Sequence, residues 1–248
     1  MSRVNEFNEL YERSALADKI CLSLFVVNLL ASVFVFSGAL FNSIAALLQS
    51  LTAVVYVLIS IANDCGWWFE AESANRKHLI EDAFGVDLTN RHSEGYFNNH
   101  FIQSFKRYVV DAFESSFFSM KVSGAMLASS VFKTVLVLGL FCLLLYTRIE
   151  SLSYADLTQA VFSAFFLEDT VYLWVFYCRV KGVYNQFYRE LVTLGVSAAE
   201  QEALLIAYAQ EYECIKAHFK VRVSSKKFNE MNASLSSEWH AIEKKIRF

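Results

Sequence analysis

The chain has 248 residues, of which 55% are hydrophobic and only 19% are charged, whereas soluble domains carry about 25% charged residues. Its net charge of -3 argues against a mainly nucleic-acid-binding protein, and its five cysteines show neither a CxxC pair nor a metal-ligand spacing. Proline is absent and glycine occurs 8 times, so little interrupts long helices. These features predict an all-α integral membrane protein.

The N-terminal part of the chain predicts a short cytoplasmic tail followed by a transmembrane hairpin. Residues 1–19 mix acidic and basic side chains and lack the basic stretch and cleavage site of a secretory signal peptide. Ile20 to Phe41 is a run of 22 residues without a charge, long enough as a helix to cross a hydrocarbon layer of about 30 Å. Ser43 to Ala62 is a second charge-free run of 20 residues. The short turn between the runs predicts an antiparallel hairpin over residues 20–62.

Residues 63–126 predict a cytoplasmic helical segment. A helix over Trp67–Phe84 is expected to continue directly from the second span. Gly85 is the stop signal that ends this helix. A loop follows from Val86 to Asn99, and helical spacing of apolar residues resumes from Phe101 to Met126. No helix breaker separates this last stretch from the next apolar run, so force on the cytoplasmic helix would reach the membrane.

A second transmembrane hairpin is predicted over residues 127–178. Its first run, Leu127 to Thr147, contains one charged residue, Lys133. Its second run, Leu157 to Cys178, contains the adjacent carboxylates Glu168 and Asp169. The complete expectation is therefore four transmembrane helices in two hairpins, with cytoplasmic helical extensions.

The C-terminal region, residues 179–248, predicts further cytoplasmic helices. The fourth span is expected to continue as a helix until Gly195, and the capping-box spacing of Ser197 and Glu200 opens another helix that ends near Phe219. A last amphipathic helix is predicted over Ser237–Phe248. Its apolar side fits either the membrane surface or packing against its own domain or a partner, and packing is the favoured alternative.

The distribution of Lys and Arg predicts the orientation. The N-terminal tail holds 3 of these residues, residues 63–126 hold 6 and the region from Arg179 holds 11, whereas the turn of the second hairpin holds only Arg148. The positive-inside rule places the basic side in the cytoplasm. Both termini and the central segment are therefore expected on the cytoplasmic side of a bacterial inner membrane.

Three ionisable residues within the second hairpin are candidates for function, because a charge inside the bilayer is costly. Lys133 and Asp169 are expected at similar depths on neighbouring antiparallel helices, and Glu168 lies beside Asp169. They would form a polar seam that opens when helices rearrange. The alternatives are a structural ion pair and a lysine that snorkels to the interface.

The cytoplasmic segments show no sign of catalysis. His78, His92 and His100 match no metal-ligand motif, and the chain has no phosphate-binding glycine loop and no nucleophile elbow. The sequence therefore predicts neither an enzyme nor a bound cofactor or metal. Asn98 or Asn99 fits as the N-cap of the helix that follows them.

The central segment nevertheless resembles a known family. Its short motifs are Asn75-Arg76, Ile80 to Gly85 with Asp82, Gly95-Tyr96-Phe97-Asn98-Asn99 and Phe113 to Phe118 with Glu114. Set between two hydrophobic hairpins, they resemble the transmembrane effectors of bacterial anti-phage defence systems. That group includes the SMODS-associated four-transmembrane effectors and the membrane effectors of retrons. The likeness covers roughly Ile20 to Cys178.

The resemblance implies a membrane effector that is silent until infection and then oligomerises or rearranges to permeabilise the inner membrane and arrest growth. Its regulatory partner would be a nucleotidyltransferase system that signals through a cyclic nucleotide, or a reverse transcriptase with its DNA product. The motif residues would contact that partner. A housekeeping channel or transporter subunit and a membrane-anchored scaffold are the alternatives.

Overall fold

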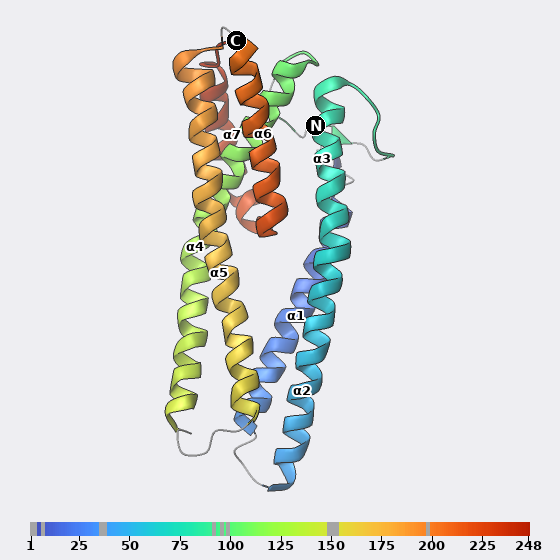
Figure 1. Cartoon of the computed structure of the whole chain (residues 1–248), viewed down its shortest axis with the longest axis vertical. Helices are drawn as coiled ribbons and strands as arrows, with labels where there is room; N and C mark the ends of the chain where they lie inside the picture. The colour runs from blue at the N-terminus through green and yellow to red at the C-terminus, as the bar shows by residue number, and fades with distance from the viewer. Residues whose placement is uncertain are drawn as a thin grey trace. The chain divides into compact units, whose positions relative to one another are not determined.

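The computed structural model describes residues 4–5, 8–34, 39–90, 93–94, 97, 100–147, 154–196 and 199–248 (Figure 1). The described chain is predominantly helical and contains one short antiparallel ladder, which pairs Val4 with Glu94 and Asn5 with Ser93. The elements are β1 (Val4–Asn5), α1 (Asn8–Phe34), α2 (Ala39–Ala62), the π-helical turn η1 (Asn63–Trp67), α3 (Trp68–Phe84), β2 (Ser93–Glu94), α4 (Phe105–Thr147), α5 (Tyr154–Tyr188), the π-helical turn η2 (Arg189–Leu194), α6 (Ala199–Phe219) and α7 (Ser225–Glu243). The predicted all-α class is confirmed.

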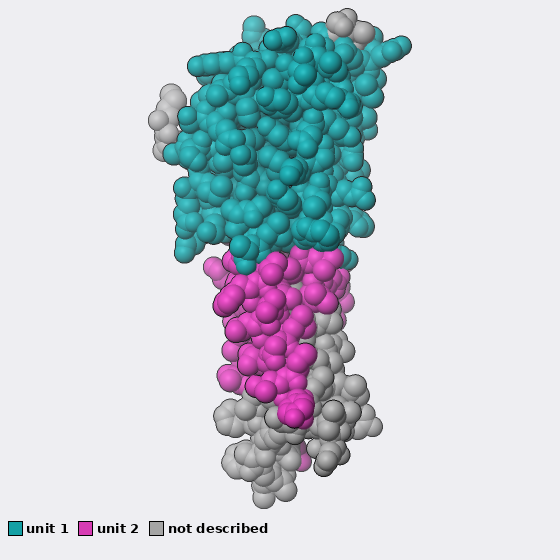
Figure 2. Space-filling model, turned by 90° about the vertical axis from the view of Figure 1, so that its left-hand side faces the viewer, with its two compact units in different colours: residues 1–8, 71–128, 172–248 teal, residues 9–70, 129–171 magenta. Residues whose placement is uncertain are grey.

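The chain divides into two compact units (Figure 2). Unit 1 comprises residues 1–8, 71–128 and 172–248, and unit 2 comprises residues 9–70 and 129–171. The helices α3, α4 and α5 each contribute residues to both units.

Unit 2 exposes large apolar side chains along its helices. Leu47 of α2 is 71% exposed and Phe132 of α4 is 69% exposed, and many leucines, isoleucines and valines of these helices are exposed as well. Among the described residues, three helical stretches are long and apolar enough to cross a membrane, namely Glu9–Ala31, Ser43–Phe84 and Phe105–Leu140. The side chains of residues 154–166, which include the first part of the predicted fourth span, lie outside the description. A surface of this kind suits lipid rather than water.

Unit 1 has an aromatic core built from α4, α5 and α7. Phe113 and Phe117 of α4 are fully buried, and the Trp239 ring of α7 meets the Phe113 ring edge-on with 5.1 Å between the ring centres. The Phe187 ring of α5 lies with its centre 5.6 Å from the centre of the Phe113 ring. Leu205 and Ala209 bring α6 to the same core. Burial of these large side chains is the main favourable term that holds the C-terminal helices on α4 and α5.

Several predicted helix boundaries are confirmed. The helix that follows the second apolar run continues through η1 into α3 and ends at Phe84, where Gly85 adopts a φ of 66°. The helix that continues α5 ends before Gly195, which adopts a φ of 81°. A glycine accepts such positive φ angles without the steric cost that other residues incur. The π-helical turns η1 and η2 within these continuous helices were not predicted.

Two helix starts differ from the prediction. α1 begins at Asn8, within the segment predicted as a tail. α4 begins at Phe105 rather than Phe101, and the Ser104 hydroxyl accepts a hydrogen bond from the Arg107 amide at 3.5 Å. Asn98 and Asn99, the predicted N-cap residues, lie outside the described residues. A serine hydroxyl satisfies an amide of the first turn well, which fixes the helix start at this point.

The prediction for the last helix was wrong in its bounds. α7 runs from Ser225 to Glu243 because the Ser224 hydroxyl caps it, accepting from the Lys227 amide at 3.3 Å. The final residues are not helical. The Arg247 amide donates to the Leu191 carbonyl at 2.8 Å, and its carbonyl accepts from Val196. The predicted packing alternative is confirmed, since α7 buries Trp239 in the core of unit 1.

Candidate functional site

A buried lysine links α6 to α3 within unit 1. The Lys216 ammonium lies 2.9 Å from the Glu213 carboxylate on its own helix and 3.7 Å from the Glu72 carboxylate of α3. It also lies 5.0 Å from the centre of the Tyr212 ring. Burial disfavours the charge, but Glu213 and Glu72 outweigh it and raise the pKa of Lys216. The residue is therefore a fixed cation at neutral pH.

Tyr212 extends this contact to α4. Its hydroxyl donates to the Ser115 carbonyl at 3.1 Å and lies 2.7 Å from the Ser119 hydroxyl. The Tyr108 phenol of α4 lies near the same charges, and burial together with Glu213 raises its pKa. One face of α6 is thus held to α3 by charge and to α4 by hydrogen bonds.

A second charged contact joins α3 and α4. The Arg107 guanidinium donates to one carboxylate oxygen of Asp82 from Nη2 at 2.7 Å and from Nε at 3.1 Å. It also donates to the Phe101 carbonyl at 3.3 Å and lies 3.9 Å from the buried Asp111 carboxylate. Asp82, singled out in the sequence as a partner-contact residue, therefore has a partner within its own unit.

The loop after α3 is tied back by Glu81. Its carboxylate accepts hydrogen bonds from the Leu88 amide at 2.6 Å and from both the amide and the hydroxyl of Thr89. His78, one turn earlier, lies 3.6 Å from the same carboxylate and is buried. Burial lowers the pKa of His78, although Asp82 and Glu81 act in the opposite direction. The imidazole is therefore neutral at pH 7.

The other motif residues are distributed over two helices and the loop. Glu114 of α4 is 3% exposed and faces the interior of unit 1. Asn75 and Arg76 are half-buried on α3. Gly95, Tyr96, Asn98 and Asn99 lie outside the described residues. The structure thus brings the described members of the motif to α3 and α4, the pair of helices that the Asp82 contact joins.

The three residues of the predicted polar seam are all exposed side chains of unit 2. Within the described part of the chain, no ion pair joins Lys133 to Glu168 or Asp169. The hydrogen bonds that join α4 and α5 here involve hydroxyls instead. The Thr170 hydroxyl lies 2.7 Å from that of Ser130 and 2.6 Å from that of Thr134.

The sequence analysis did not predict the polar contacts between α1 and α2. The Asn28 amide of α1 donates to the Gln49 carbonyl at 2.9 Å and to the Thr52 hydroxyl at 3.0 Å, both on α2. A signal for these contacts was present in the sequence, because each charge-free run contains an amide residue, Asn28 in the first and Gln49 in the second. Hydrogen bonds of this kind help apolar helices to associate in lipid, where apolar burial offers little drive.

A similar contact lies at the other end of this helix pair. The Asn63 side chain of η1 accepts from the Ser14 hydroxyl at 2.6 Å and donates to the Asp18 carboxylate at 2.8 Å. Two separate polar contacts therefore fix α1 against α2 and the π-helical turn that follows it.

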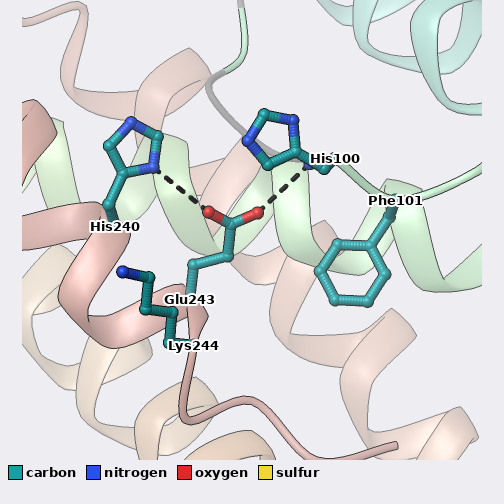
Figure 3. A pocket seen from close by; sticks show the side chains of 5 residues that line it. All are labelled: His100, Phe101, His240, Glu243 and Lys244. Carbon is teal, nitrogen blue, oxygen red and sulfur yellow. Dashed lines mark hydrogen bonds and ion pairs between the residues drawn. The ribbon is translucent and has the colours of Figure 1, made fainter.

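A surface pocket of about 570 Å³ lies in unit 1 between the start of α4 and the end of α7 (Figure 3). His100, Phe101, His240, Glu243 and Lys244 line it. The Glu243 carboxylate accepts from the His100 amide at 3.2 Å and lies 3.2 Å from His240 Nδ1, and the two imidazole rings are parallel with 6.3 Å between their centres. This contact attaches the end of α7 to the segment before α4.

No protein-family model matches the chain, and neither a curated protein nor a solved structure matches it.

Proposed function

We propose that this protein is a bacterial inner-membrane effector in which a cytoplasmic helical unit controls four membrane-spanning helices. One observation carries the proposal. α4 exposes apolar side chains in unit 2 and forms a charged contact with α3 in unit 1, and α3 continues from α2, which also exposes apolar side chains in unit 2. α4 continues without a break from Phe105 to Thr147, and α2 continues through η1 into α3. A rearrangement of unit 1 would act directly on the spans.

The proposed topology has two hairpins with both termini in the cytoplasm. α1 and α2 would form the first hairpin, and the apolar parts of α4 and α5 the second. The concentration of Lys and Arg on one side of these spans supports the orientation. The exposed apolar surface of the described helices supports insertion, because that surface would be costly in water.

The proposed activity is permeabilisation or depolarisation of the membrane when a regulatory partner releases or triggers the protein, followed by growth arrest. The family resemblance of the central segment supports an anti-phage defence role and a homo-oligomeric active form. It also indicates the kind of partner, a nucleotidyltransferase system with a cyclic nucleotide signal or a reverse transcriptase with its DNA product. The motif helices α3 and α4 would receive that partner in unit 1.

The experiment is induced expression in a bacterial host with and without the neighbouring genes, with membrane potential followed by a voltage-sensitive dye. Loss of potential and growth arrest are expected when the protein is expressed alone. Unchanged potential and growth would refute the effector function and favour a housekeeping channel or a scaffold. The dye response precedes lysis, so early time points separate depolarisation from general cell death.

The seam residues are tested in the same assay. Glu168→Gln combined with Asp169→Asn is expected to reduce depolarisation. The matched control is Glu200→Gln with Glu202→Gln, which removes two exposed carboxylates from α6. Equal depolarisation by wild type and the seam variant, at equal amounts in the membrane, would remove these carboxylates from the mechanism.

A further inference from the structure

The turn between α6 and α7 gathers positive charge without negative charge. We call residues 217–229, which include the end of α6 and the start of α7, the α6–α7 turn. This segment contains Lys220, Arg222, Lys226 and Lys227 but neither Asp nor Glu. The first carboxylate beyond it, Glu230, lies 3.5 Å from Lys227. The defence mechanism proposed above does not use this turn.

Three contacts fix the position of this basic turn within unit 1. Phe219, at the end of α6, meets the Tyr172 ring of α5 edge-on with 5.9 Å between the ring centres. The Ser224 amide lies 3.3 Å from the sulfur of Met126 on α4. Phe228 of α7 packs at 5.8 Å on Phe118 of α4. The turn is therefore a built part of unit 1 and lies beside defined points of α4 and α5.

The backbone of the turn directs its apolar and charged residues differently. Val221 and Val223 are partly buried against the core of unit 1, whereas Lys220 and Lys226 are exposed. Lys220 adopts a φ of 50°, the left-handed conformation that lets the chain reverse after α6. The valines anchor the turn, and the two lysines are left at its surface.

The contact points of the turn coincide with the ends of apolar segments. Met126 directly precedes the apolar run that begins at Leu127. On α5, Tyr172 and Trp174 are both exposed although they are large aromatic residues. Tyrosine and tryptophan favour the headgroup layer of a bilayer, and lysine and arginine cannot enter its hydrocarbon without a large cost. In the membrane topology proposed above, the turn would therefore lie at the headgroup level of α4 and α5.

We propose that the α6–α7 turn is a binding surface for the anionic phospholipid headgroups of the cytoplasmic leaflet. The inference rests on the membrane topology of the proposed function and is independent of its toxicity. Lysine and arginine side chains near an anionic membrane surface bind it more strongly than a zwitterionic one, each by about fivefold. A turn with several such residues would hold unit 1 against the bilayer from which α4 and α5 emerge.

The test uses the full chain in nanodiscs that contain phosphatidylglycerol and phosphatidylcholine in graded ratios. The protein is extracted with mild detergent, and the retained lipids are identified by native mass spectrometry. Lys220→Gln with Lys226→Gln is expected to lower the preference for phosphatidylglycerol about 25-fold, the product of two fivefold effects. The same substitutions to arginine are expected to preserve it.

Lys244→Gln with Lys245→Gln is the matched control. It removes two exposed lysines from the opposite end of α7 and changes the net charge equally. Either of two results would overturn the proposal. The Lys220 and Lys226 variant could prefer phosphatidylglycerol as strongly as wild type does, or the control variant could lose this preference to the same extent. Tight binding of a short single-stranded oligonucleotide to the turn in phosphatidylcholine nanodiscs would also overturn it and assign the surface to nucleic acid. A negative result in the depolarisation assay would leave the lipid-binding and oligonucleotide-binding results unaffected.

Discussion

The Lys216 ammonium of α6 lies 3.7 Å from the Glu72 carboxylate of α3, the helix that continues from the apolar helix α2. The Lys216 side chain is 13% exposed and that of Glu72 9%. Two charges so far removed from water depend on each other, because either one alone would be costly to bury. The ion pair is therefore a defined attachment between α3 and the C-terminal helices of unit 1.

Lys216→Met is expected to weaken this attachment strongly. The substitution leaves the Glu72 and Glu213 carboxylates buried without their cation, and removal of one partner from a buried pair typically costs about 3–5 kcal/mol. Amide hydrogen exchange of the protein in nanodiscs would show faster exchange in α3 and α6. Lys77→Met, at an exposed position of α3, serves as the control. Unchanged protection of α3 in the Lys216 variant would show that apolar packing alone holds the helix.

The elements that could be predicted from sequence are those fixed by local physics. The charge-free run from Ser43 to Ala62 predicted an apolar helix, because length and hydropathy alone decide whether a helix suits lipid, and α2 covers this run. Gly85 and Gly195 predicted helix ends, because positive φ angles are costly for other residues. These signals require no knowledge of which helices pack together.

The site could be predicted only in part, because it depends on contacts between distant segments. Glu72 and Lys216 carry no local sign that they pair across α3 and α6. The start of α7 was missed because its buried residues Leu235, Trp239 and Ile242 all lie in the second half of the helix. The Ser224 cap was a weaker signal than that apolar stripe. The contacts of Asn28 with α2 could have been suspected from an amide inside an apolar run.

Gly124 of α4 permits a close approach of α5. A Cβ atom at this position would lie 3.0 Å from Cε2 of Tyr177, whereas a Cβ atom at Gly182 of α5 would meet nothing within 4 Å. Gly124→Leu is therefore expected to lower the free energy of unfolding by about 1–3 kcal/mol through overpacking. Gly182→Ala is expected to raise it by about 0.5–1 kcal/mol through helix propensity. Thermal unfolding in detergent would measure both. Gly182→Leu is the size-matched control, and equal stability of Gly124→Leu and Gly182→Leu would contradict the close packing at Gly124.

His78 is expected to make the stability of unit 1 sensitive to acid. Its pKa is lower in the folded state than in the unfolded chain, where it is about 6.5. The stabilising contribution of the neutral imidazole is therefore complete above about pH 6.5 and is lost as the pH falls through the folded-state pKa. His78→Gln should lose less stability than wild type between pH 7.5 and pH 5.5, as followed by unfolding in detergent. His218→Gln, at an exposed position of α6, should behave like wild type. Equal acid sensitivity of wild type and His78→Gln would exclude this role.

The hydroxyl of Ser14 is expected to stabilise the contact between α1 and η1. It donates to the Asn63 side chain at 2.6 Å, whereas the Ser23 hydroxyl donates to the Lys19 carbonyl of its own helix at 2.9 Å. Ser14→Ala should lower stability by about 0.6 kcal/mol, the average for hydrogen bonds between helices in a membrane protein, and by no more than about 1.7 kcal/mol. Ser23→Ala removes a hydroxyl without affecting helix association, so it should have little effect. Steric trapping of the protein in bicelles would measure the difference, and equal costs would show that the Asn63 contact contributes nothing.

The proposed topology predicts which cysteines a membrane-impermeant maleimide can reach. Cys214 is exposed on α6 of unit 1 and is expected in the cytoplasm, so in a variant that keeps only this cysteine it should react after cell disruption but not in intact spheroplasts. Ser151→Cys, in the predicted turn of the second hairpin, should react in intact spheroplasts because that turn is expected on the periplasmic side. Reaction of Cys214 in intact spheroplasts would reverse the orientation. Protection of the cysteine at position 151 there would show that α4 and α5 do not form a spanning hairpin, and the route by which unit 1 acts on the membrane would then have to involve α1 and α2 alone.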